Sequence, residues 1–207
     1  MKVLLVNGSP EEKGCTYTAL NEAASTLNGA GIETEIMWLG KEPVNDCINC
    51  GGCAKLRKNR CVFDNDIVNR LLEKAEQCDG FIFGSPVYYA HADGRILSVL
   101  DRVFYAGSRV FAYKAGAVVA SARRAGTTCA LDDLMKYLTI SNMFVVSSQY
   151  WNMVHGFTPE DVKQDDEGMQ TMRVLGRNMA YLLNCLEAGK DIPKPEKEKR
   201  IMTNFID

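Results

Sequence analysis

The sequence predicts an α/β fold in which helices cover both faces of a five-stranded parallel sheet. Two observations carry this prediction: short apolar runs of strand length alternate with longer amphipathic segments, and this pair recurs five times within 207 residues. Strand–helix–strand units connect through right-handed crossovers, which place successive strands parallel in one sheet. At 46% hydrophobic and 24% charged, the chain also has enough apolar residues for a sizeable core.

The predicted elements follow one another along the chain. The strands are expected at KVLLV (2–6), ETEIMWL (33–39), GFIFG (80–84), AGAVVAS (115–121) and MFVVSS (143–148). The helices are expected at 16–27, 64–77, the apolar stripe 96–104, 127–138 and 168–186, because their apolar residues recur three or four positions apart. Five such strands suit the doubly wound order 2-1-3-4-5 of flavodoxin-like folds, in which ligands bind at the carboxyl ends of the strands.

A single domain, residues 1–189, accounts for this pattern. A cysteine-rich insertion at 46–62 follows the second strand, and residues 190–207 form a charged, Pro-interrupted C-terminal arm. The net charge of -2 gives no reason to expect nucleic acid or a membrane surface as a partner. No run reaches the roughly 18 apolar residues of a membrane span, and the apolar run in MKVLLVNGSP is too short for a signal-peptide core. We therefore expect a cytoplasmic protein.

The first loop at the carboxyl edge, NGSPEEKGCT (7–16), favours a phosphate. Gly8 and Gly14 permit tight turns, Ser9 and Thr16 supply hydroxyls, and the following helix offers free N–H groups. An ordinary capped strand-to-helix loop is the alternative. Neither G-x-x-x-x-G-K-[ST] nor G-x-G-x-x-G is present, which disfavours a triphosphate or a tightly held dinucleotide and leaves a monophosphate.

Two further loops are expected at the same edge. GSPVYYAHADGR (84–95) carries two tyrosines that suit a flat ring, and His91 as a candidate proton donor. SARRAGTT (121–128) brings Arg123 and Arg124, whose charge would stabilise an anionic reduced flavin. Packing aromatics, a bystander histidine and a solvated basic turn are the alternatives.

The stretch CINCGGCAKLRKNRC has the spacing C-x2-C-x2-C-x7-C, formed by Cys47, Cys50, Cys53 and Cys61. Eight cysteines in a reducing compartment argue against a disulfide framework. Four thiolates can hold a [4Fe–4S] cluster, and the short run resembles that of bacterial ferredoxins. Zinc more often takes two separated pairs, and thiols without metal remain open. Between the last two cysteines lie Lys55, Arg57, Lys58 and Arg60. Their charge would offset a thiolate cluster or form a solvated face.

GSPEEKGCT, GSPVYY…LDR and SARRAGTT, in that order, resemble the flavodoxin-like NAD(P)H-dependent FMN reductases. The cysteine motif, followed by DNDIVNRLLEKAEQCDGFIFGSPVYY and later DEGMQTMRVLGR, resembles the iron–sulfur flavoproteins more closely, over roughly residues 1–188. The resemblance implies FMN, with its phosphate at Ser9, Gly14, Cys15 and Thr16. Cys15 stands where relatives often carry Asn. The flavin ring is implied to lie against Pro86, Val87, Tyr88, Tyr89, Ala122, Arg123, Arg124 and Gly126.

The resemblance implies an oxidoreductase in which NAD(P)H reduces FMN and the flavin reduces a small acceptor, such as a quinone, a nitro or azo compound, or free flavin. Candidates for the substrate wall are Tyr88, His91, Trp151 and His155. The alternative is an electron carrier that exchanges electrons with ferredoxin through a [4Fe–4S] cluster on the four cysteines. A regulatory nucleotide-binding module is a third hypothesis. Such flavoproteins are usually homodimers or homotetramers.

Overall fold

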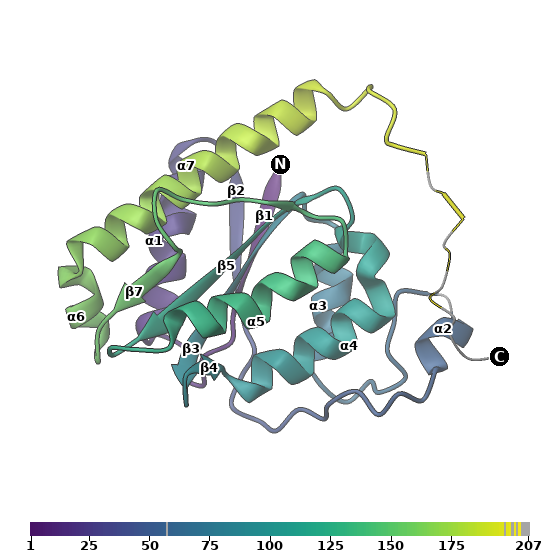
Figure 1. Cartoon of the computed structure of the whole chain (residues 1–207), viewed down its shortest axis with the longest axis horizontal. Helices are drawn as coiled ribbons and strands as arrows, with labels where there is room; N and C mark the ends of the chain where they lie inside the picture. Colours follow the sequence, from purple (N-terminus) through teal and green to yellow (C-terminus); the bar gives the residue numbers. More distant parts are fainter. Residues whose placement is uncertain (57, 197, 200, 202, 204–207) are drawn as a thin grey trace.

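A parallel β-sheet runs through the centre of the computed structural model, with helices on both faces (Figure 1). The structure describes residues 1–56, 58–196, 198–199, 201 and 203. Arg57 and the end of the predicted C-terminal arm (197, 200, 202 and 204–207) lie outside the described residues. The described part of that arm, 190–196, follows the last helix without helix or strand.

The main strands pair in parallel and are β1 (Lys2–Asn7), β2 (Glu33–Trp38), β3 (Gly80–Tyr88), β5 (Ala115–Ala122) and β6 (Phe144–Val145). They lie in the order β2-β1-β3-β5-β6. Counted along the five expected strands, this is 2-1-3-4-5, so the predicted fold class and strand order are confirmed. Two short strands that were not predicted, β4 (His91–Ala92) and β7 (Met153–His155), pair with β3 and β5.

The predicted fifth strand, 143–148, is wrong in its length. Only β6 pairs with the beginning of β5; the chain then leaves the sheet and returns as β7, parallel to the end of β5. Asn152 bridges the interruption through two hydrogen bonds of 3.0 Å. Its side-chain amide donates to the Val118 carbonyl, and its backbone carbonyl accepts from the Ala120 N–H. The apolar pattern of the sequence does not reveal this interruption, because Val146 is buried although it belongs to no strand.

The third strand is longer than the predicted 80–84. Its extension pairs with β5 on one side, where Pro86 lies opposite Ser121, and with β4 on the other, where Tyr88 lies opposite His91. Pro86, which lies in the predicted loop 84–95, therefore belongs to the strand. Neighbouring strands on both sides extend β3 through residues that look like a loop in the sequence.

The five expected helices form as α1 (Cys15–Gly29), α3 (Ile67–Ala75), α4 (Gly94–Phe111), α5 (Thr127–Ile140) and α7 (Asp166–Ala188). The helix α3 begins after the predicted residue 64, because the carboxylate of Asp66 accepts the Val68 N–H at 3.1 Å and caps the first turn. Two short helices that were not predicted are α2 (Gly52–Leu56) and α6 (Pro159–Gln164).

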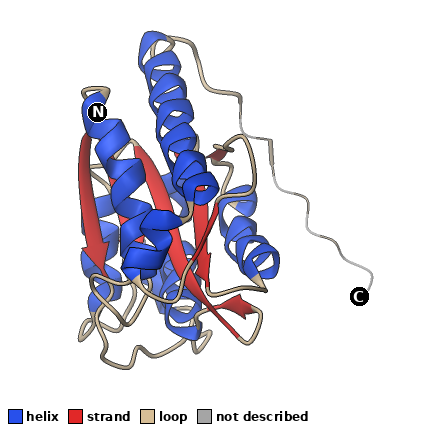
Figure 2. Cartoon of the chain, turned by 90° about the vertical axis from the view of Figure 1, so that its left-hand side faces the viewer, coloured by secondary structure: helices blue, strands red, loops and turns tan. Residues whose placement is uncertain are grey.

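The two faces of the sheet carry separate layers of core residues, and Figure 2 shows the helices on either side. Along β1, Leu4 and Val6 pack toward α3, α4 and α5, whereas Val3 and Leu5 pack toward α1 and α7. Side chains alternate across a strand, so a strand covered on both faces must be apolar at every position. This explains the unbroken run KVLLV.

The helix α7 spans 23 residues and buries one stripe of its surface, whereas Tyr181 on its outer side is 74% exposed. In the described part of the chain, no helix combines the length and the apolar character that crossing a membrane requires.

We expect Phe111→Ala to lower the free energy of unfolding by about 3–5 kcal/mol, because it opens a cavity in the core. Phe111 is fully buried, and its ring lies 4.7 Å from that of Phe81 and 4.5 Å from that of Phe104. Urea denaturation followed by circular dichroism measures the change. The matched control, Tyr181→Ala on exposed α7 surface, should change stability by no more than about 0.5 kcal/mol. Equal losses in the two variants would contradict this packing.

Candidate functional site

The first loop is built around Asn7, the fully buried last residue of β1. Its side-chain carbonyl accepts the Ser9 N–H at 3.1 Å, and its amide donates to the Glu12 carbonyl at 3.0 Å. Ser9 in turn accepts the Glu11 N–H on its hydroxyl at 3.1 Å. These contacts hold the backbone in a compact turn ahead of α1.

The helix α1 begins without a side-chain cap, because its N-cap residue is Gly14. The first N–H groups of such a helix have no partner within the helix and carry its partial positive charge. A side chain at Gly14 would come within 2.9 Å of the Glu11 side chain, so the turn has room only for glycine. The start of α1, with Cys15 and Thr16, therefore suits an anion.

Thr16 and Ser121 join the first loop to the third. Their hydroxyl oxygens lie 2.8 Å apart, and the two residues are 1% and 3% exposed. The Thr16 hydroxyl thus points toward the end of β5, so a phosphate in the first loop would meet the Thr16 backbone N–H rather than this hydroxyl.

Backbone contacts join the second loop to the other two. The Gly8 N–H donates to the Gly84 carbonyl at 2.9 Å. Gly126, the N-cap of α5, has a φ of +91° and faces the turn of the second loop so closely that a Cβ would lie 2.5 Å from the Ala90 Cα. The three predicted loops therefore form one continuous surface at the carboxyl edge of the sheet.

The second loop is a tight hairpin between β3 and β4. Tyr89 and Ala90 form its turn with φ values of +51° and +64°, and Tyr89 is 100% exposed. Tyr88 is 45% exposed, and burial, followed by the charges of Asp93 and Glu11, raises the pKa of its phenol. Tyr88 therefore stays protonated at neutral pH and can donate a hydrogen bond. His91 is exposed, with Nδ1 2.6 Å from the Ala92 carbonyl.

The third loop places Arg123 and Arg124 at its exposed tip, directly after buried Ala122. His155, at the end of β7, lies opposite Ala122 in the sheet and donates its backbone N–H to Asp165 at 2.6 Å. Trp151 is 59% exposed beside Tyr150, with the ring centres 5.0 Å apart. His155, Arg123 and Arg124 thus lie at the same edge as the first loop, whereas Trp151 precedes β7 and does not lie at its carboxyl end.

The four motif cysteines line one pocket of about 280 Å³ against α4. Asn49 and Gly51 adopt positive φ values of +51° and +66°, which turn the chain sharply between Cys47 and Cys53. A Cβ on Gly52 would lie 2.3 Å from Val62, so the segment closes tightly on itself. The four thiols of the sequence motif therefore line the same pocket.

All eight cysteines are free thiols. Among the described residues, no three His, Cys, Asp or Glu side chains lie close enough together to hold a metal ion. The four cysteines therefore share a pocket without forming a closed ligand set for a single ion.

Three residues of these sites were not predicted. Asn7 and Ser121 end or follow apolar strands, and only their contacts with other loops reveal what they do. Arg102 lines the cysteine pocket and is 2% exposed. A charged residue within the apolar stripe 96–104 was a signal that could have identified it.

The strand order and the helices on both faces define a flavodoxin-like fold, and the three loops form a candidate ligand site at the carboxyl ends of the strands. A flavodoxin from an archaeon shares the fold with a TM-score of 0.60 and 13% sequence identity, over 89% of this chain and 99% of that one.

The sequence profile of the family described as NADPH-dependent FMN reductase matches residues 1–158. The chain therefore belongs to this family of FMN-binding flavoprotein oxidoreductases. An iron–sulfur flavoprotein of Methanocaldococcus jannaschii is 31% identical over 195 residues, which cover 90% of this chain and 100% of that protein. An iron–sulfur flavoprotein of Methanosarcina thermophila is 25% identical, with coverages of 92% and 100%. The resemblance predicted from the motifs is confirmed.

We expect Gly126→Ala to weaken FMN binding and to destabilise the protein by about 1–3 kcal/mol, the cost of strained backbone. The new Cβ must displace Ala90 and accept the left-handed φ of +91°. Fluorescence titration with FMN and urea denaturation measure the two effects. Gly94→Ala is the matched control, since Gly94 also begins a helix at this edge and no atom lies within 4 Å of the place that its Cβ would take. If both variants bind FMN like the wild type, Gly126 does not shape the site.

We expect Thr16→Val to cost about 1–3 kcal/mol of stability, because it leaves the buried Ser121 hydroxyl without its partner. Ser121→Ala should cost a similar amount, and the double variant less than the sum of the two. A double-mutant cycle in urea measures this coupling. Strictly additive losses would show that the two hydroxyls do not interact.

Proposed function

We propose that this protein is an FMN-dependent oxidoreductase that takes electrons from NAD(P)H and passes them to a small acceptor, such as a quinone, a nitro or azo compound, or free flavin. The observation that supports the proposal is that three loops are joined at the carboxyl edge. The first of them leads into α1, a helix whose N-terminus has no side-chain cap. Bound FMN supplies the redox chemistry, and the protein supplies position and electrostatics.

In this proposal the first loop holds the FMN phosphate through Ser9, Gly14, Cys15 and Thr16. Burial raises the pKa of the Cys15 thiol, so this side chain is neutral and does not repel a phosphate. Its sulfur lies 3.7 Å from the Gly156 carbonyl, to which it donates. The phosphate contacts are therefore expected from backbone N–H groups, not from the cysteine side chain.

The flavin ring is proposed to lie between the hairpin and the third loop. Residues that would line it are Pro86, Val87, Tyr88, Tyr89, Ala122, Arg123, Arg124 and Gly126. The exposed arginines bring positive charge to this edge, which favours the reduced anionic ring. Tyr88 and His91 would face the acceptor, with His155 completing the wall.

Because Tyr88 and Tyr89 are exposed, the proposed ring site would be open to solvent on that side. Large exposed aromatics are typical of surfaces that contact a partner. We propose a homodimer or homotetramer in which another subunit covers this edge. In this proposal each subunit consists of a single domain, residues 1–189, and the protein works in the cytoplasm.

The second proposal is an iron–sulfur flavoprotein that carries electrons between FMN and a partner such as ferredoxin. The common pocket of the four cysteines favours it. In a [4Fe–4S] cluster each thiolate binds a different iron, so the sulfurs surround a volume and need not converge on one point. Cys47, Cys50, Cys53 and Cys61 would hold the cluster, which passes electrons one at a time.

We expect protein purified anaerobically to show flavin absorption together with iron and acid-labile sulfide, and Cys50→Ser to lose the iron and sulfide but keep FMN. Cys129→Ser, an exposed cysteine on α5, is the matched control and should keep all three. Absorption spectra with iron and sulfide assays on the same samples measure this. Flavin without iron or sulfide in reconstituted wild type would remove the second proposal and leave the first.

The electron source separates the two activities. Mixing the anaerobic protein with NADH or NADPH in a stopped-flow instrument should bleach the flavin rapidly if the first proposal holds. A flavin that ignores both nucleotides but is bleached by reduced ferredoxin would identify an electron carrier instead.

A further inference from the structure

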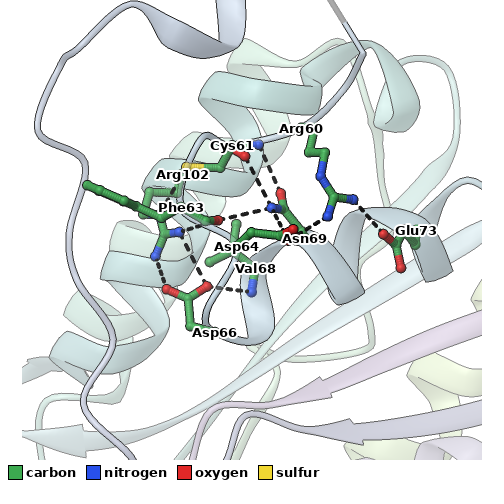
Figure 3. Close-up of polar contacts among 9 residues, drawn as sticks. All are labelled: Arg60, Cys61, Phe63, Asp64, Asp66, Val68, Asn69, Glu73 and Arg102. Atoms are coloured by element: carbon green, nitrogen blue, oxygen red, sulfur yellow. Dashed lines mark hydrogen bonds and ion pairs between the residues drawn. The ribbon is translucent and has the colours of Figure 1, made fainter. Parts of the chain in front are cut away.

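Arg102, in the middle of α4, is one of the largest fully buried side chains of the protein (Figure 3). A guanidinium is always charged in proteins, and burying it is costly unless its donors are all paired. It therefore needs a compensating set of acceptors, and the identity of those acceptors indicates what the charge is for.

The acceptors of Arg102 belong to the cysteine segment and its flanks. Nε donates to the Cys61 sulfur at 3.4 Å. Nη1 donates to the Asn45 carbonyl at 3.1 Å, and Nη2 to the Phe63 carbonyl at 3.3 Å. Both Nη atoms also pair with the carboxylate of Asp66, which caps α3. One side chain on α4 thus connects the two ends of the cysteine segment.

The backbone of Cys61 is held separately by α3. Asn69 accepts the Cys61 N–H at 2.9 Å and donates to the Cys61 carbonyl at 3.1 Å. Figure 3 shows Asn69 and Arg102 approaching Cys61 from different helices. Cys50, by contrast, is exposed, and the Cys53 thiol makes only a long contact of 3.8 Å with the Tyr105 carbonyl. Cys61 is therefore held at its backbone and its sulfur, and it is the best anchored of the four.

Among the described residues, Arg102 is also the one cation that lines the cysteine pocket. Four thiolates and their irons carry net negative charge, and N–H···S hydrogen bonds and nearby positive charge set the reduction potential of a cluster. The remaining described basic residues of the segment, Lys55, Lys58 and Arg60, do not line the pocket. Since the Asp66 carboxylate offsets the charge of the guanidinium, Arg102 acts on the pocket mainly through its Nε–H···S hydrogen bond to Cys61.

We propose that Arg102 is the positioning residue of the cysteine pocket: it fixes the Cys61 sulfur as a ligand and holds the bound cluster at a higher reduction potential than the cysteines would alone. This inference rests on the proposed iron–sulfur function. Arg102 belongs to α4 and lies outside the cysteine motif, so the motif alone does not reveal this role.

Two variants test the role of Arg102. Arg102→Lys keeps the buried charge but loses the planar fork, and Arg102→Met combined with Asp66→Asn removes both charges while Asn still caps α3. Arg109→Met, at an exposed position on the same helix, is the matched control. Urea denaturation identifies folded variants before the other measurements.

We expect both Arg102 variants to shift the midpoint potential of the cluster to more negative values, whereas the FMN potential stays unchanged. Retention of iron against a ferrous chelator should weaken about 10- to 100-fold, as for other residues that orient metal ligands. In metal-free protein, alkylation of Cys61 should become slower relative to that of Cys50, because the N–H donor that favours the Cys61 thiolate is lost. Arg109→Met should match the wild type in all three measurements.

A measurement on wild type covers the case in which the variants do not fold. With ¹⁵N-arginine labelling, electron–nuclear double resonance of the reduced cluster should show a coupled arginine nitrogen. Its absence, or variants with wild-type potential, iron retention and Cys61 alkylation, would overturn the role of Arg102 while a wild-type cluster still supports the proposed function. A wild type that takes up no iron or sulfide would overturn both.

Discussion

The carboxyl edge of this protein depends on contacts between loops that are far apart in the sequence. The Gly8–Gly84 backbone hydrogen bond and the Thr16–Ser121 hydroxyl pair connect the first loop to β3 and to the end of β5. The sheet brings the three loops to one edge, because the strands that they follow, β1, β3 and β5, are parallel and end there. The contacts then reduce their freedom, so that a helix terminus, a hairpin and a basic turn present one surface to a ligand.

The helix α4 relates this surface to the cysteine pocket. It begins beside the β3–β4 hairpin, where Asp93 caps it, and reaches the pocket at Arg102 about 12 Å further along its axis, at 1.5 Å per residue. Its inner face is tied to the core through Phe104 and Phe111. The part of α4 that precedes its non-helical residue, Gly107, is therefore shared by the two proposed sites.

The predicted strand order, helices and loop positions were correct where the periodic spacing of apolar residues is enough to determine the secondary structure. They were wrong at 143–148 and 84–88, where hydrogen bonds to neighbouring strands determine whether a residue belongs to the sheet. A side chain such as Asn152, which replaces a strand-to-strand hydrogen bond, has no local signal, since its partners lie more than thirty positions away.

The sequence by itself determined the α/β class, the family and the chemical groups available to the site. These groups are hydroxyls and free N–H groups after the first strand, aromatics and arginines after the third and fourth, and four thiols in fifteen residues. These depend on residue type and short spacing. Only the tertiary structure decided which atoms are already engaged. Thr16 turns its hydroxyl to Ser121, the four cysteines line one pocket, and Arg102 reaches Cys61 across 41 positions. Contacts of that range depend on how helices pack on the sheet, and no local pattern encodes them.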